Sequence, residues 1–150
     1  MQRRFLGVIG ALALLAAGCT QSQYLRYVDA VMNGHEAEAK GAVAQYEAER
    51  ADATAGRPCA EWYDVAISTG WTPDQWRSPM ARTMWGESNC NPNAHSPAGA
   101  IGLMQVMPMW ANDCGGSVGM LYDPEFNLTC ALHVLNVSSW NAWDAWRSYF

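Results

Sequence analysis

The sequence predicts a mainly α-helical domain with at most a very small β element. Three prolines directly follow a residue that can cap a helix, in the pairs Thr72-Pro73, Ser78-Pro79 and Asp123-Pro124. Such pairs are typical of helix starts, because proline fits the first helical turn. Apolar residues then recur at helical spacing. Only residues 99–106 (GAIGLMQV) interrupt this pattern, and their glycines predict two short extended pieces or a tight loop.

The first 18 residues are interpreted as an export signal rather than as part of the fold. Two arginines precede an apolar run over residues 5–17, which is shorter than the about 20 residues that span a bilayer. Residues 15–19 (LAAGC) resemble a bacterial lipobox, which implies that Cys19 is lipidated and becomes the new N-terminus. We therefore expect an extracytoplasmic protein anchored to a bacterial membrane. The alternative is a secreted protein in which Cys19 is incidental.

The charge excludes a nucleic-acid partner. The whole chain has a net charge of −5. Loss of residues 1–18 removes two arginines and leaves seven basic against 14 acidic residues, a net charge of −7. Such a chain has little attraction for phosphates or anionic headgroups. Any attachment to a membrane must therefore come from the lipid.

Four further cysteines predict two disulfides in an exported protein. We favour Cys59–Cys90 and Cys114–Cys130, because both pairs would join neighbouring segments beside one cleft. The other two pairings, free thiols and zinc binding stay open as alternatives. No C-x-x-C motif is present and the three histidines lie far apart, so we expect neither a metal site nor a cofactor.

Residues 19–57 are expected to form a tether or partly helical spacer, because they are rich in alanine and glutamate. The alternative is a surface helix docked through four apolar residues at near-helical spacing: Tyr24, Tyr27, Val28 and Val31. All eight tryptophans and the first proline, Pro58, lie beyond residue 56. This change in composition places the folded domain at residues 58–150.

The domain is expected to begin with a helix from Pro58 that Gly70 ends. A short helical turn should follow from Thr72 to Trp76. A helix from Met107-Pro108 is also expected after the glycine-containing stretch. The last clear helix should run from Asp123-Pro124 to about Val137.

A helix from Pro79 to Ser88 carries the main candidate for catalysis. Met80, Met84 and Glu87 are four and three residues apart and therefore share one face. A carboxyl group in apolar surroundings can keep its proton near neutral pH and act as a general acid. The alternative is that Glu87 is a solvated residue at the end of a helix, where the helix dipole disfavours it.

Four motifs follow one another in this region: ES at 87–88, NPNA at 91–94, SPAGAIGLMQVMP at 96–108 and DPEFNL at 123–128. In order and spacing they resemble the signature of the transglycosylase SLT family, over roughly residues 79–137. The resemblance implies a lysozyme-like helical domain with a saccharide cleft and Glu87 as its catalytic acid. It also implies substrate contacts from six residues: Ser88, Gly102, Leu103, Met104, Gln105 and Asn127.

Several of these positions have a structural alternative. Leu103 and Met104 are ordinary core residues in that case, and Asn127 makes a structural hydrogen bond. Most tryptophans are expected in the core, with Trp110 and Trp143 the best candidates for the cleft.

The activity that the resemblance implies is cleavage of the β-1,4 bond between N-acetylmuramic acid and N-acetylglucosamine, with 1,6-anhydro-muramoyl products. The partners would be peptidoglycan glycan strands, and the protein would be a monomer. The alternatives are a hydrolytic lysozyme, with Asp113 or Asp123 as second carboxylate, a chitin-directed enzyme, and a non-catalytic wall-binding lipoprotein. The family's Ala-Tyr-Asn-Ala-Gly segment is absent, and Tyr149 is a candidate to replace its tyrosine.

Overall fold

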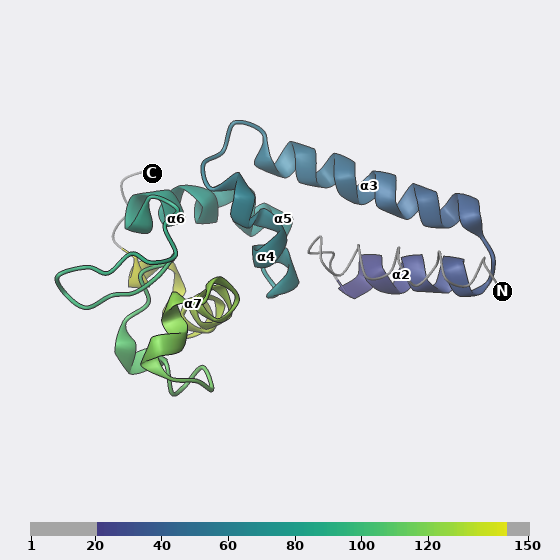
Figure 1. The fold of residues 1–150 in the computed structure, drawn as a ribbon. Helices are drawn as coiled ribbons and strands as arrows, with labels where there is room; N and C mark the ends of the chain where they lie inside the picture. Colours follow the sequence, from purple (N-terminus) through teal and green to yellow (C-terminus); the bar gives the residue numbers. More distant parts are fainter. Residues whose placement is uncertain (1–20, 144–150) are drawn as a thin grey trace.

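The computed structural model describes residues 21–143, and this part of the chain is mostly helical (Figure 1). Two helices, α2 (Gln21–Met32) and α3 (Glu36–Thr54), form an antiparallel hairpin that projects from the remainder. The remainder is a domain of shorter helices that pack around α7 (Pro124–Ser138). Within residues 21–143, no helix has both the length and the apolar character needed to span a membrane.

The hairpin has a small apolar contact of its own. Tyr27 and Ala30 of α2 are buried together with Ala39 of α3. Partly buried side chains flank this contact: Val28, Val31, Ala42 and Val43. The chain reverses at Gly34, whose φ of 74° favours glycine. The expected spacer is therefore an ordered helical hairpin, in which apolar residues of α2 pack against the first half of α3.

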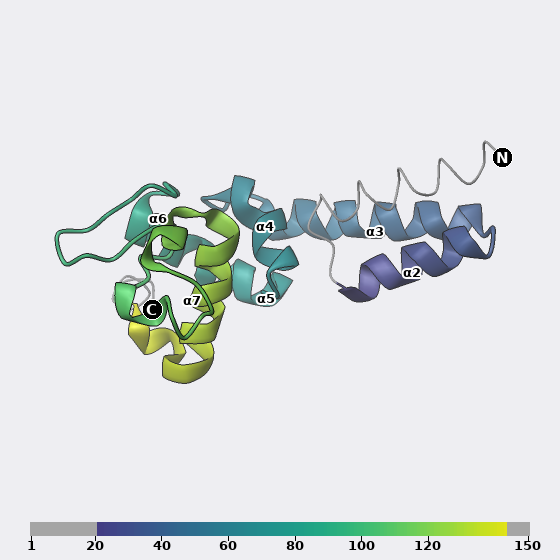
Figure 2. The same ribbon diagram turned by 60° about the horizontal axis from the view of Figure 1, so that its bottom comes forward.

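The end of α3 is joined to the domain by polar contacts. The Tyr46 hydroxyl donates to Asp64 at 2.5 Å, and Arg50 Nε lies 2.8 and 2.9 Å from the two oxygens of the same carboxylate. The hydrogen bond to Asp64 raises the pKa of Arg50. Ala53 is buried in the domain core. The core thus extends across the expected boundary at residue 57, and Figure 2 shows α3 reaching α4 and α5.

The first half of the domain contains five short elements: η1 (Ala60–Trp62), α4 (Tyr63–Ser68), α5 (Pro73–Gln75), η2 (Trp76–Met80) and α6 (Ala81–Ser88). A capping box starts α5, since Thr72 Oγ1 accepts from the Gln75 backbone and the Gln75 side chain accepts from the Thr72 backbone. The expected helix start at Ser78-Pro79 coincides with a kink between two helices. Ser78 is extended, with φ −160° and ψ 120°, as the residue before a proline prefers, and the backbone is helical again at Met80, directly before α6.

The second half begins with a long loop over residues 89–106, drawn at the left of Figure 1. Single bridges pair His95 with Ile101 and Ile101 with Val106, which agrees with the expected very small β element. Three 3-10 turns and one helix complete this half: η3 (Pro108–Trp110), η4 (Val118–Tyr122), α7 and η5 (Ser139–Ala142). The helix expected from Met107 is only the short turn η3. Asp123 caps α7 by accepting from Phe126 N at 2.8 Å.

Large side chains fill the core between α4, α6 and α7. The fully buried residues include Trp71, Trp76, Tyr63, Met80 and Met84. The Trp71 indole donates to the Leu128 carbonyl at 3.0 Å. Both expected disulfides are present: Cys59–Cys90 joins the first half of the domain to the loop of the second half, and Cys114–Cys130 lies within the second half.

Candidate active site

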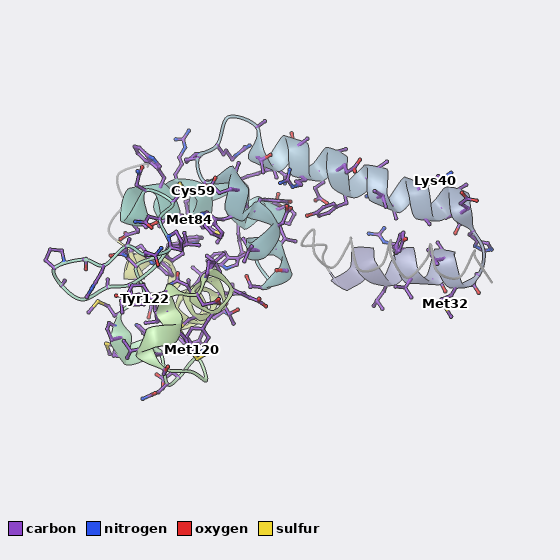
Figure 3. The ribbon with its side chains drawn as sticks, in the orientation of Figure 1. Met32, Lys40, Cys59, Met84, Met120 and Tyr122 are labelled. Carbon is purple, nitrogen blue, oxygen red and sulfur yellow. A yellow bond between two sulfur atoms is a disulfide. The ribbon has the colours of Figure 1, made fainter. Side chains whose placement is uncertain are left out.

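Glu87 lies on the last turn of α6, at the edge of the core. Met80 and Met84 on the same face are fully buried, whereas Glu87 is half-buried. Met84 of α6 is labelled in Figure 3. The helix ends because Asn89 and Cys90 adopt left-handed backbone conformations, with φ of 54° and 63°. The carboxyl group therefore stands where an apolar helix face meets the surface.

The residues that follow Glu87 are held from outside α6. The Trp62 indole donates to the Cys90 carbonyl at 3.0 Å, and the disulfide joins Cys90 to Cys59. Ser88 is buried, and its hydroxyl donates to the Met84 carbonyl at 3.0 Å. The Ser88 hydroxyl thus donates its hydrogen bond within α6. This fixation limits how far the end of α6 can move.

Gln105 fastens the two arms of the loop together. The Ala94 carbonyl accepts from Gly102 N at 2.8 Å and from Gln105 Nε2 at 3.2 Å. Gln105 Nε2 also lies 3.0 Å from the Gly102 carbonyl. The side chain is partly exposed, and its Oε1 takes part in neither bond. Of the loop residues expected at the substrate, Gln105 is the one that keeps both exposure and a free acceptor position.

Asn127 supports the loop from α7 and is fully buried. Its Oδ1 accepts from Met104 N at 2.9 Å, and its Nδ2 donates to the carbonyls of Ile101 at 2.9 Å and Leu121 at 2.8 Å. The amide is used up by backbone partners, as the structural alternative predicted. This differs from the expected substrate contact, because a side chain with 0% exposure cannot reach a glycan.

Gly102, Leu103 and Met104 are likewise part of the core. Leu103 and Met104 have 0% exposure, so neither side chain offers a surface to a sugar ring. Gly102 has φ of 80°, and a Cβ there would lie 2.3 Å from both Asn127 Nδ2 and the Leu121 carbonyl. The glycine is required by this close approach rather than by a ligand. The sequence resemblance located the loop, but the side chains of Leu103 and Met104 point inward, whereas Gln105 stays partly exposed.

The two tryptophans expected in the cleft border a small hollow beside Gln105. Trp143 is almost fully buried and donates to the Met104 carbonyl at 2.6 Å, whereas Trp110 is half-buried. The hollow has a volume of about 40 Å³. Ligand pockets usually measure about 300 Å³ or more. Trp143 therefore belongs to the core, and this hollow alone is too small to hold a saccharide.

Other candidate groups lie elsewhere. The Asp123 carboxylate caps α7, and Asp113 is exposed. Among residues 21–143, no group of three or more histidine, cysteine, aspartate or glutamate side chains could hold a metal ion. Cys19 and Tyr149 lie outside the described residues.

One contact of the loop was not anticipated. Tyr122 in η4 and His95 in the loop place Oη and Nδ1 3.4 Å apart, with their rings edge to face. The two residues are 27 positions apart, so no local sequence signal pairs them. Figure 3 shows Tyr122 on the side of the domain away from the hairpin. The loop is therefore tied to η4 as well as to α7.

The site thus offers one half-buried carboxyl group beside a loop with a fixed backbone. Such an arrangement can donate and then accept a proton. One protein-family model, described as Transglycosylase SLT domain, matches residues 64–148. No curated protein and no solved structure matches the chain.

Proposed function

The chain belongs to the transglycosylase SLT domain family, and from this premise we propose that it is a lytic transglycosylase with Glu87 as its catalytic acid and base. The family domain is lysozyme-like and helical, and its substrate is peptidoglycan. The proposed bond is the β-1,4 linkage between N-acetylmuramic acid and N-acetylglucosamine. The observation that carries the proposal is the half-buried Glu87 at the end of an otherwise buried helix face.

The proposed reaction needs only one protein carboxyl group. Protonated Glu87 gives its proton to the glycosidic oxygen, and the bond to the muramyl C1 breaks as N-acetylglucosamine leaves. The acetamido group of the substrate stabilises C1. Glu87, now a carboxylate, takes the proton from the muramyl C6 hydroxyl while O6 bonds to C1. The product is a 1,6-anhydro ring, and Glu87 is again protonated.

The contact of Asp123 supports this scheme over one in which Asp123 is a second catalytic carboxylate. Retaining and inverting glycosidases ordinarily place two carboxyl groups on either side of the bond. Asp123, one candidate for the second group, is used as the cap of α7. Gln105 remains the proposed saccharide contact, since its side chain is partly exposed and its Oε1 can accept a hydrogen bond.

The test is mass spectrometry of the soluble products that the purified protein releases from peptidoglycan sacculi. We expect muropeptides that end in 1,6-anhydro-muramic acid. Glu87→Gln keeps the shape of the side chain but cannot supply a proton, so the rate should fall at least about 100-fold. Glu47→Gln is the matched control, because it removes an exposed carboxylate of α3 outside the family match, and it should leave the rate unchanged.

Other products would redirect the proposal. Reducing-end products that disappear in Glu87→Gln would keep the acid but make the enzyme a hydrolytic lysozyme. Equal activity on chitin would remove the requirement for muramic acid. Binding to sacculi without any product would replace the enzyme with a wall-binding lipoprotein.

We also propose that the chain is anchored outside the cytoplasmic membrane through a lipid on Cys19. The support is the sequence LAAGC at residues 15–19 after an apolar run. Labelling with a fatty-acid analogue in a bacterial host should mark the wild-type chain, and Cys19→Ala should abolish the label. A labelled Cys19→Ala chain would contradict the anchor.

A further inference from the structure

A second hollow lies between the end of α3 and the start of α6. It has a volume of about 350 Å³, within the usual range of ligand sites. Arg57, Arg77 and Arg82 line it together with Ser78. Residues 21–143 contain six lysines and arginines, and half of them meet at this one place. We call this site the arginine hollow.

Arg77 gives the arginine hollow a rigid wall. Its Nη2 lies 2.8 Å from Asp52 Oδ2, and its Nη1 lies 2.8 Å from Asp74 Oδ1. These hydrogen bonds raise the pKa of Arg77 against the opposing effect of burial. The two carboxylates offset the charge of Arg77. Its role is therefore to fix the wall of the arginine hollow rather than to attract a ligand.

Arg57 presents a fixed guanidinium without a carboxylate partner among the described residues. Its Nη1 donates to the carbonyls of Asp52, Ala53 and Ala55 at 3.1 to 3.3 Å, and its Nε donates to the Arg77 carbonyl at 3.3 Å. Nη2 takes part in none of these bonds. Because the Arg57 side chain is already ordered, it loses little conformational entropy when an anion bonds to its Nη2.

Arg82 adds a positive charge that the fold itself does not require. It is exposed, it lies on the first turn of α6, and within residues 21–143 it makes no ion pair. A cation near a helix N-terminus is unfavourable with respect to the helix dipole, whereas an anion there is favourable. The three arginines face two carboxylates, Asp52 and Asp74, so one net positive charge remains beside this helix start.

The arginine hollow is separate from the candidate active site. Arg82 and Glu87 are five residues apart on α6, which corresponds to about 140° around the helix and about 7.5 Å along it. The two side chains thus leave different faces of one rigid helix. A ligand in the arginine hollow would affect how the protein binds its substrate rather than the chemistry at Glu87.

We propose that the arginine hollow binds a carboxylate from the peptide stem of peptidoglycan and acts as an accessory wall-binding site. This inference rests on the proposed function, since peptidoglycan is the substrate. Arginine forks match planar carboxylates, and the stems carry several. The net charge of the chain is −5, which disfavours a long phosphate polymer, whereas the one net positive charge of the arginine hollow suits an isolated carboxylate.

The experiment compares co-sedimentation of the full chain with two substrates: intact sacculi, and glycan strands from which an amidase has removed the stems. Arg82→Gln should weaken binding to intact sacculi about tenfold and leave binding to stem-free strands unchanged. Arg82→Lys keeps the charge but loses the fork, and should give an intermediate affinity. Lys40→Gln is the matched control, because it removes one positive charge at the hairpin tip, where Lys40 pairs with Glu36.

Binding and cleavage are scored separately, so this proposal and the proposed function can fail independently. Cleavage of stem-free strands by Arg82→Gln at the wild-type rate supports an accessory role. Equal loss of binding on both substrates, or no loss on either, would overturn the proposal. Competition by inorganic phosphate but not by free stem peptide would also overturn it, because the site would then select phosphate.

Discussion

The hairpin and the domain are both helical, but different interactions hold them together. The hairpin has a few small apolar contacts around Tyr27 and exposed pairs such as Lys40 with Glu36. Exposed pairs of this kind contribute little, about 0.3–0.5 kcal/mol each. The domain has two disulfides and a core of large side chains, including Trp71 and Trp76. Helical content alone therefore says little about rigidity.

The difference teaches where chemistry can be placed. Glu87 and the loop over residues 89–106 are fixed by side chains from several elements, which a general acid requires. The hairpin tip near Met32 and Lys40 is far from these contacts in Figure 3. We expect changes in the domain core to abolish cleavage and changes at the tip to leave it intact.

The largest effect is expected for Asn127→Leu. The substitution keeps the shape but leaves Met104 N and the Leu121 carbonyl buried without the Asn127 partner, and the Ile101 carbonyl keeps only its bond from Val106 N. At about 1–3 kcal/mol for each group, the domain should lose about 4 kcal/mol of unfolding free energy. Denaturant unfolding measures this loss. Asn136→Leu, at an exposed position on the same helix, is the control and should change stability little.

An intermediate effect is expected at alkaline pH through Tyr63. Burial, followed by the charge of Glu49, raises the pKa of Tyr63 to about 12 from 10. The neutral phenol is thus favoured in the folded state. Stability is fully present below about pH 10 and falls as the pH rises to about 12, by about 2–3 kcal/mol. Tyr63→Phe should remove this slope from a series of unfolding curves, and an unchanged slope would assign it to another group.

The smallest effect on the domain is expected for Tyr27→Ala. The buried contacts of Tyr27 lie within the hairpin, so α2 should lose helicity by circular dichroism at a lower temperature than in the wild type. The domain should change by less than about 0.5 kcal/mol. Tyr46→Phe sharpens the comparison, because it removes the hydroxyl that binds Asp64 and should cost the domain about 1 kcal/mol. Equal destabilisation by both would mean that hairpin and domain unfold as one unit.

Local sequence signals predicted two helix starts correctly. The caps Thr72 and Asp123 act within three residues of themselves, and both make the expected bonds. The shared face of Met80, Met84 and Glu87 also follows from spacing alone, and the first two are buried as that face requires. The extended backbone of Ser78 is also a local effect, since the residue before a proline avoids the helical region.

Longer-range features were harder to predict. Residues that look like substrate contacts in a motif, such as Met104 and Asn127, are buried because partners 23 positions apart meet in the fold. The packing of the hairpin was missed because alanines such as Ala30 and Ala39 give little periodic contrast. The arginine hollow was missed for a similar reason, since Arg57 and Arg82 come together only when α3 meets α6.

The bonds made by Met104 also set an order of events during synthesis. Its N–H donates to Asn127, which lies 23 residues later in the chain, and its carbonyl accepts from Trp143, which lies 39 residues later. Because a chain emerges from its N-terminal side, the loop backbone is exposed well before either partner exists. The hydrogen bonds of the loop beside Glu87 are therefore completed by residues C-terminal to it. The chain acquires its finished site only after the segment through Trp143 has emerged.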